Sequence, residues 1–141
     1  MADPWRFSVS VAGAVVNGDG RLLAIQRRDN GHWEPPGGLV EPGESLHETL
    51  VREVREETGL QVEPGQLSGV YQNVPRDIVA VVFRCLPLMG ELKHSHESAS
   101  VAWLTTAEVS AHMDPAYAVR LLDALQPGPA VRAHDGQKLL D

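Results

Sequence analysis

The alternation of apolar and polar positions in the first part of the chain is typical of strands with one buried face. Residues 7–17 alternate and are rich in valine, and an apolar run resumes over residues 21–27. Between them, the segment from Asn17 to Gly20 consists of residues that favour tight turns, so we predict a β-hairpin. Residues 28–43 are dense in glycine and proline and are expected to form a loop with short strand pieces.

A helix is predicted from residue 45 to residue 58, where three apolar side chains recur every four positions and form one stripe. The three are Leu46, Leu50 and Val54. Ser45 and Glu48 have the spacing of a capping box, in which each side chain bonds the other residue's free amide. Gly59 supplies the left-handed residue that commonly ends a helix. We expect this helix to lie on a sheet through its apolar stripe.

Three further apolar runs predict strands and complete a mixed sheet. They cover residues 67–73, 78–86 and 101–104. The single cysteine, Cys85, falls in the second of these runs, where we expect it to be buried. One cysteine cannot form an intrachain disulfide, which is compatible with a reducing cytoplasm.

After the strands, a short helix capped by Thr106 and a second helix opened by Asp114 and Pro115 are predicted. They are expected to cover about residues 106–111 and 115–125. Residues 126–141 contain proline and glycine without a hydrophobic period. We therefore predict one domain over residues 1–125 and a C-terminal tail over residues 126–141 that is loose or packs irregularly.

The composition is that of one ordinary globular domain, with 141 residues of which 43% are hydrophobic. Lys and Arg number 12 against 19 Asp and Glu, and the net charge of -7 disfavours nucleic acid or an anionic membrane as the main partner. No apolar run approaches the ~18 residues that a membrane span requires. The apolar segment 7–16 is not expected to be a signal peptide, because Asp3 precedes it and serines interrupt it. A cytoplasmic location is expected.

Three glutamates of the predicted helix, Glu53, Glu56 and Glu57, share one arc of about 100° when successive residues are placed 100° apart. Like charges four residues apart repel, so this face needs a compensating cation. Mg²⁺ suits it, because this ion takes a few carboxylates together with substrate phosphates. The double glycine that ends at Gly38 lets a backbone carbonyl approach such an ion, and Arg52 could orient a neighbouring carboxylate.

These residues resemble the Nudix box, the signature of a family of pyrophosphohydrolases. Its pattern is Gly, five residues, Glu, seven residues, then Arg-Glu-aliphatic-any-Glu-Glu-any-Gly-aliphatic. The fixed positions are filled here by Gly38, Glu44, Arg52, Glu53, Val54, Glu56, Glu57, Gly59 and Leu60. A chance match is on the order of 10⁻⁸ for a chain of this length. The order of elements around the box extends the resemblance over most of the first 110 residues.

The resemblance implies an α/β fold, a Nudix α/β/α sandwich with a mixed β-sheet. It also implies hydrolysis of a nucleoside diphosphate linked to another group, by water attacking phosphorus with the assistance of Mg²⁺ or Mn²⁺. Residue by residue, it implies metal ligation by Glu53, Glu56, Glu57 and the carbonyl of Gly38, with support from Arg52 and Glu44. A diphosphate is itself a polyanion, so a cation between it and this acidic chain agrees with the charge balance.

A general base is also expected, to activate or orient the water. Glu56 and Glu57 are candidates within the box. Glu97 is the third, because it stands six residues before a tryptophan, as a loop glutamate often does in the family. Arg27 and Arg28 end a predicted strand near the expected cleft, where each could contact phosphate or be an ordinary exposed charge.

His94 and His96 have the spacing of two ligands on one strand, but no further nitrogen or sulfur ligand lies nearby in the sequence, so a zinc site is disfavoured. Trp33 and Trp103 are expected to pack in the core more than to stack on a base. Pro35 stands where family members commonly have a bulky aliphatic residue. Because it lacks the amide proton of a central strand, the local backbone there is expected to differ.

The sequence leaves the substrate open among ordinary or oxidised nucleoside triphosphates, ADP-ribose and other nucleotide sugars. A non-catalytic nucleotide-binding sensor of the same fold is an alternative, although such domains usually lose box carboxylates that are all present here. An RNA 5'-end pyrophosphohydrolase is a further alternative, disfavoured by the acidic charge. Relatives often pair, so a homodimer is compatible with the sequence.

Overall fold

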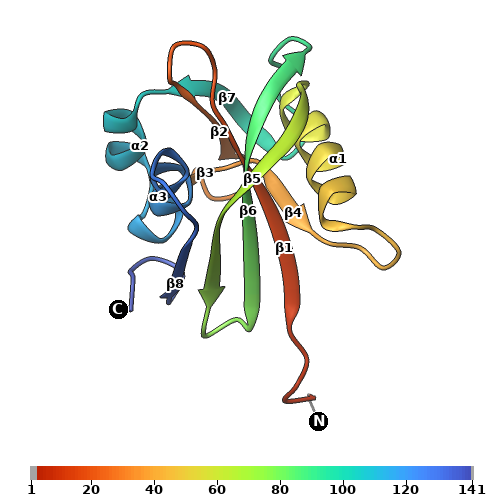
Figure 1. Cartoon of the computed structure of the whole chain (residues 1–141), viewed down its shortest axis with the longest axis vertical. Helices are drawn as coiled ribbons and strands as arrows, with labels where there is room; N and C mark the ends of the chain where they lie inside the picture. Colours follow the sequence, from red (N-terminus) through yellow and green to blue (C-terminus); the bar gives the residue numbers. More distant parts are fainter. Residues whose placement is uncertain (1–2, 141) are drawn as a thin grey trace.

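The computed structural model describes residues 3–140, which form two sheets enclosed by helices (Figure 1). The five-stranded sheet has the order β4-β1-β6-β5-β8, and the three-stranded sheet has the order β3-β2-β7. The strands are β1 (Ser8–Val15), β2 (Leu22–Arg27), β3 (Trp33–Glu34), β4 (Gly37–Leu39), β5 (Gln61–Asn73), β6 (Ile78–Met89), β7 (Ser98–Leu104) and β8 (Ala130–His134). The helices are α1 (Leu46–Thr58), α2 (Thr106–His112) and α3 (Pro115–Leu122), the last continued by a 3-10 turn over Asp123–Leu125.

Helix α1 covers one side of the sheets, and α2 and α3 cover the other (Figure 1). In the larger sheet β1 runs parallel to β6 and β5 parallel to β8, whereas the β1–β4 and β5–β6 pairs are antiparallel. The predicted α/β/α sandwich with a mixed sheet is therefore confirmed. The smaller sheet is antiparallel throughout.

The prediction of a hairpin between residues 7–17 and 21–27 is wrong, although the turn itself forms. The Asn17 side chain accepts hydrogen bonds from the amides of Asp19 and Arg21, at 3.0 and 2.9 Å. Beyond one bridge between Val16 and Leu22, however, the strands separate into different sheets. Strand β1 is paired along both edges, with β4 and β6, so no edge remains for β2.

The apolar stripe of α1 packs on β1, as its period predicts. Leu50 and Val54 are fully buried and form one core cluster with Val11, Val15 and other apolar side chains. Cys85 belongs to the same cluster, and its burial raises the pKa of the thiol to about 12. The predicted cap of α1 is also present, since both hydrogen bonds of the Ser45–Glu48 capping box are made.

Several predicted boundaries move. Strand β6 ends at Met89 rather than at residue 86, and β7 begins at Ser98 rather than at residue 101. Strand β5 begins at Gln61 rather than at residue 67, because it continues through Pro64 with register shifts against β6. The cap of α2 is Thr105 rather than Thr106, and it forms a capping box with Glu108. Pro35 lies between β3 and β4, so its missing amide proton interrupts neither strand.

The C-terminal segment is more ordered than predicted, since residues 130–134 form β8 and pair in parallel with β5. The prediction of a loose or irregular tail is wrong for these residues. Arg132 of β8 binds both carboxylate oxygens of Asp123 at 2.7 Å, and the Tyr71 hydroxyl donates to the same carboxylate at 2.9 Å. This buried network attaches β8 to the end of α3 and to β5.

We predict that Asp123→Ala lowers the free energy of unfolding by roughly 2–3 kcal/mol, because it removes the acceptor of the Arg132 guanidinium and of the Tyr71 hydroxyl. Urea unfolding of the variant and the parent chain measures the change. Asp19→Ala, at an exposed turn, is the control and should stay within ~0.5 kcal/mol of the parent. Equal effects of the two substitutions would show that the network does not stabilise the fold.

Candidate active site

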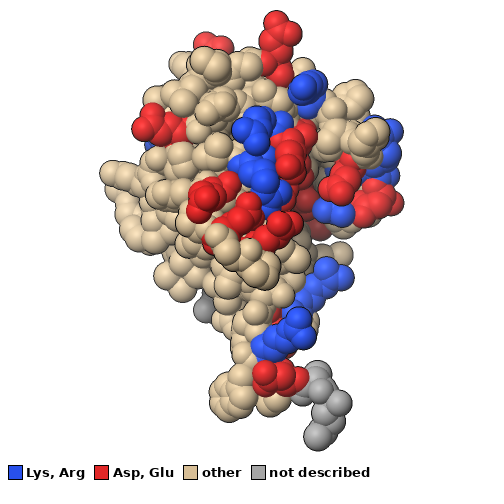
Figure 2. Space-filling view, turned by 90° about the vertical axis from the view of Figure 1, so that its right-hand side faces the viewer, with Lys and Arg blue, Asp and Glu red and all other residues tan. Residues whose placement is uncertain are grey.

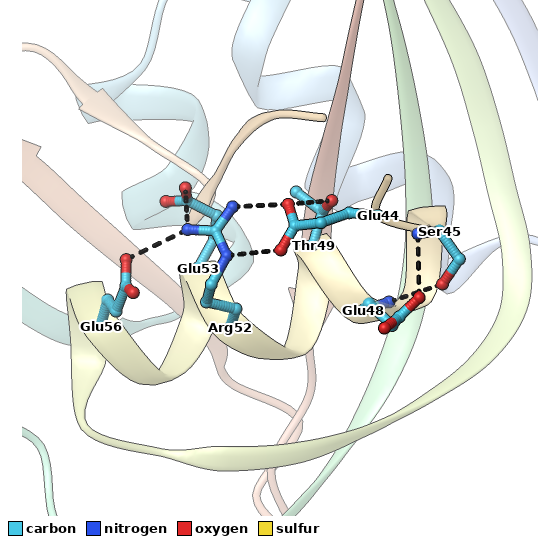
Figure 3. A network of polar contacts seen from close by, with 7 residues as sticks. All are labelled: Glu44, Ser45, Glu48, Thr49, Arg52, Glu53 and Glu56. Carbon is cyan, nitrogen blue, oxygen red and sulfur yellow. Dashed lines mark hydrogen bonds and ion pairs between the residues drawn. The ribbon is translucent and has the colours of Figure 1, made fainter. Parts of the chain in front are cut away.

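Arg52 of α1 gathers three carboxylates around one guanidinium (Figure 3). Its Nε and Nη2 donate to the two oxygens of Glu44, both at 2.8 Å. Its Nη1 donates to Glu53 at 3.0 Å and to Glu56 at 3.3 Å. The two parallel bonds to Glu44 are the bidentate geometry that suits arginine and that lysine cannot reproduce. Arg52 thus reaches its neighbouring carboxylates, as the sequence suggested.

Glu44 is the anchor of this network and lies immediately before the N-cap of α1. The Thr49 hydroxyl donates to it at 2.9 Å, in addition to the two bonds from Arg52. The hydrogen bonds from Arg52 are the main reason that the pKa of Glu44 falls to about 2. Glu44 is therefore held ionised, and it connects the loop before α1 to the middle of the helix.

Glu57 faces the sheet instead. Its side chain is nearly buried, and one oxygen accepts a hydrogen bond of 2.7 Å from the Gly37 amide. Burial is the largest cause that raises the pKa of Glu57 to about 8, and the charges of Glu53, Glu34 and Glu97 raise it further. Burial likewise raises the pKa of Glu53, partly offset by Arg52. Two desolvated carboxylates with acidic neighbours form a site that favours a cation.

The glycines of β4 permit this close packing. A Cβ atom at Gly38 would lie 2.6 Å from the carboxyl carbon of Glu53, and one at Gly37 would overlap the Val11 carbonyl oxygen of β1. A side chain at Gly37 would therefore push β4 away from β1, and one at Gly38 would displace the carboxylate of Glu53. The backbone of Gly38 consequently lies against the carboxylate cluster, where the sequence predicted a carbonyl ligand.

The donor set fits a hard divalent cation, because it consists of carboxylate and carbonyl oxygens. Among residues 3–140, no three His, Cys, Asp or Glu side chains are already arranged around a common metal position. Glu53 and Glu56 are directed to Arg52, and Glu57 is directed to Gly37. Figure 2 shows the α1 face, on which acidic and basic side chains gather together. Metal binding would require these carboxylates to exchange protein partners for the ion.

Glu97 lies in the loop before β7. Burial is the largest cause that raises the pKa of Glu53 and Glu57, and the charge of Glu97 also raises both. Arg28 fastens this loop, since its backbone amide donates to the Glu97 carbonyl at 2.8 Å and its side chain donates to the carbonyls of His96 and Ser98. The structure thus gives Arg28 a positioning contact that the sequence did not predict.

Arg27 forms ion pairs with Asp29 at 2.8 Å and with Glu34 at 3.3 Å. Arg27 also lines a cavity together with Gly37 and Gly38, so it lies near the candidate active site. Trp33 and Trp103 pack against the two core clusters, as expected of packing residues. Neither tryptophan lines this cavity.

Sequence reasoning missed most of the polar residues that line the same cavity. Among them are Glu34, Asn73, Arg76, Tyr117 and Arg120. The one available signal was Arg120, an arginine on the apolar face of the predicted helix, four residues after Ala116. Ala116 and Arg120 are both buried, and burial is unusual for an arginine.

The comparisons with known proteins agree with this geometry. The NUDIX domain profile matches residues 6–125, so the chain belongs to the Nudix family and is a Nudix pyrophosphohydrolase. A MutT-like protein of Streptomyces ambofaciens is 58% identical over 94% of this chain and 87% of its own length. The CTP pyrophosphohydrolase of Escherichia coli is 30% identical over 90% of this chain and 98% of its own length.

A solved structure of the MutT protein from Methanosarcina mazei superposes with a TM-score of 0.73 and 27% identity, covering 86% of this chain and 94% of that one. Relatives of this family act on small nucleotides and generally use divalent metal ions. Within the part of the chain that the structure describes, no helix is long and apolar enough to cross a membrane.

The Arg52–Glu44 pair predicts a specific acid dependence of stability. The pKa of Glu44 is lowered in the folded chain from 4.5 to about 2, so its stabilisation is present above about pH 4.5 and is lost as the pH falls toward 2. The difference in unfolding free energy between the parent and Glu44→Gln should therefore shrink on acidification. Urea unfolding across this range measures it, with exposed Glu41→Gln as the control. A difference that is independent of pH would contradict the ion pair.

Proposed function

We propose that this chain hydrolyses a nucleoside diphosphate linked to another group, with the assistance of Mg²⁺ or Mn²⁺ and with water attacking phosphorus. The observation that carries the proposal is the Arg52 network. One guanidinium holds Glu44, Glu53 and Glu56, and the carboxylate of Glu53 lies against the bare backbone of Gly38. In a chain that belongs to the Nudix family, this network brings oxygen ligands together on the face of α1 where a diphosphate would bind.

Glu53, Glu56 and Glu57, with the carbonyl of Gly38, are the residues that would hold the divalent cation. When bound, such an ion neutralises phosphate charge and lowers the pKa of its water. Arg52 is the positioning residue, since it fixes two of these carboxylates through contacts of 3.0 and 3.3 Å. Glu44 acts through Arg52, because it occupies the other side of the guanidinium.

The general base would be a carboxylate within reach of the attacking water. Glu56, Glu57 and Glu97 are the candidates. Glu56 is half-exposed and held only by Arg52, whereas the buried Glu57 is bound to the Gly37 amide. Glu97 is exposed on its loop, and its charge raises the pKa of Glu53. Arg27, which lines the cavity beside Gly38, and Arg28, which contacts the Glu97 loop, are the candidate contacts for substrate phosphates.

The relatives support a small nucleotide as substrate. Their names include a CTP pyrophosphohydrolase, an ADP-ribose pyrophosphatase and a putative 8-oxo-dGTP diphosphatase. A substrate of this size suits an acidic chain with a net charge of -7 better than an RNA end does. The complete set of box carboxylates favours turnover over a sensor that only binds nucleotide.

Glu56→Gln is predicted to lower kcat by about 10²- to 10⁴-fold, because it removes one charged metal ligand and one candidate general base. Since the side chain is half-exposed, the melting temperature should change little. Phosphate release from nucleoside triphosphates, ADP-ribose and nucleotide sugars, with Mg²⁺ and with chelator, measures the effect. Glu63→Gln, on an exposed face of β5, is the matched control. If the parent still hydrolyses these substrates in the presence of chelator, the proposal that hydrolysis depends on a divalent metal ion is wrong.

Arg52→Lys is predicted to weaken Mg²⁺ activation and kcat/KM together by about 10- to 100-fold, because lysine keeps the charge but not the two-point contact with Glu44. A Mg²⁺ titration of activity reports the first quantity, and steady-state kinetics reports the second. Arg55→Lys, on the exposed side of the same helix, should leave both unchanged. Full activity of Arg52→Lys would show that positive charge alone suffices.

A further inference from the structure

Residues 130–140 form a C-terminal strap that contacts both β5 and α3 (Figure 1). Strand β8 of the strap pairs with β5. The Val74 amide, in the turn between β5 and β6, donates to the His134 carbonyl at 3.0 Å. The Ala116 amide, in the first turn of α3, donates to the Gln137 carbonyl at 3.0 Å. The strap follows the residues that match the family profile, which ends at residue 125, and it is nevertheless joined to that domain on two sides.

His134 lies between these two contacts, and its side chain is fully buried. Its Nε2 lies 3.2 Å from Nη2 of Arg120, and its Nδ1 lies 3.0 Å from the amide nitrogen of Gly136. Both neighbours are N–H donors. A neutral imidazole can accept a hydrogen bond from one of them, whereas an imidazolium can accept from neither. The docked strap therefore favours the neutral form of His134.

Arg120 adds a positive charge beside this ring. It is 9% exposed, its Nε has no hydrogen-bond partner, and within residues 3–140 no carboxylate forms an ion pair with it. Glu34, whose charge acts on Arg120, is paired with another arginine. The rings of Tyr117 and Tyr71 lie 4.7 and 5.7 Å from the guanidinium carbon. A protonated His134 would thus place a second buried charge beside a cation that has no paired anion.

The acidic groups around the strap do not offset that second charge. Asp123, at the end of α3, is already bound by Arg132 of the strap and by the Tyr71 hydroxyl. Asp135 follows His134 directly, but one of its carboxylate oxygens accepts hydrogen bonds from two amides of the turn that comes after it. Protonation of the ring would therefore be resisted by the packing on every side.

We propose that His134 makes the strap a pH-dependent latch, in which the neutral ring keeps the strap docked on α3 and β5 and protonation of the ring releases it. The elements that the strap joins also line the cavity beside Gly38, through Asn73 of β5 and through Tyr117 and Arg120 of α3. Release in acid would loosen this wall of the candidate active site. The latch is a property of the folded chain and does not depend on the proposed function.

The direction of the pH dependence follows from the surroundings of the ring. Burial is the largest cause that lowers the pKa of His134, the charge of Arg120 lowers it further, and the charge of Asp135 opposes both. In a released strap the ring meets water, and its pKa returns to about 6.5. The released form thus binds more protons than the docked form. Docking is constant well above pH 6.5, and below it the ratio of docked to released strap falls by up to about tenfold per pH unit.

Amide hydrogen exchange, followed by NMR on the whole chain without ligand, tests the latch. The Val74 and Ala116 amides report on docking, because each donates to the strap. From about pH 7.5 to about pH 5.5 their protection factors should fall by about 3- to 10-fold, to values below that of the Gly13 amide, which is bonded to Pro36 away from the strap. If they exchange together with Gly13 at both pH values, the strap opens only with the whole fold and the latch is refuted.

His134→Gln is the matched variant, because glutamine keeps an acceptor for Arg120 and cannot be protonated. In this variant the protection of the Val74 and Ala116 amides should be the same at both pH values. His32→Gln, at an exposed histidine between β2 and β3, is the control and should keep the pH dependence of the parent. A dependence of the parent's size in His134→Gln would overturn the proposal.

Titration of the histidine rings in the parent gives a second measurement that needs no variant. The NMR signals of the His134 ring should titrate with a midpoint below that of His32, in the range in which the Val74 and Ala116 amides lose protection. A midpoint for His134 equal to or above that of His32, or full protection of those amides after the ring has been protonated, would contradict the latch.

Discussion

The bidentate bond between Arg52 and Glu44 is the interaction on which the candidate active site depends. Three carboxylates on one arc of α1 repel one another, and a single guanidinium offsets that repulsion by donating to Glu53 and Glu56 as well. Because Glu44 precedes the helix cap, the same bond joins the loop after β4 to the middle of α1. The site is therefore part of the packing between α1 and the sheet.

A steric constraint acts in parallel with this electrostatic one. Gly37 and Gly38 place bare backbone against β1 and against the Glu53 side chain of α1, and the Gly37 amide binds the buried carboxylate of Glu57. The amide holds that carboxylate at the strand while desolvation raises its pKa. Arg52 and Gly37 thus position the acidic residues from opposite sides, one from the helix surface and one from the sheet.

Two arginines, Arg52 of α1 and Arg120 of α3, have opposite surroundings. Arg52 has an acceptor for each of its guanidinium nitrogens, and it stabilises the arrangement of the protein itself. Arg120 has a buried Nε without a partner and no carboxylate contact among the described residues. A satisfied arginine organises structure, whereas an unsatisfied one makes a further positive charge on its neighbour, here His134, more costly.

The sequence by itself determined what depends on near neighbours in the chain. The capping box of α1, its apolar stripe and the carboxylate arc all follow from spacings of three or four residues. The tertiary structure alone decided which strands pair, and it separated β1 from β2 because β4 and β6 occupy both edges of β1. It also joined β8 to β5 and brought Arg120 and Glu34 to one cavity, 86 positions apart in the sequence. Such contacts lie outside any local pattern, because they depend on which edges and faces remain open once the rest of the chain has packed.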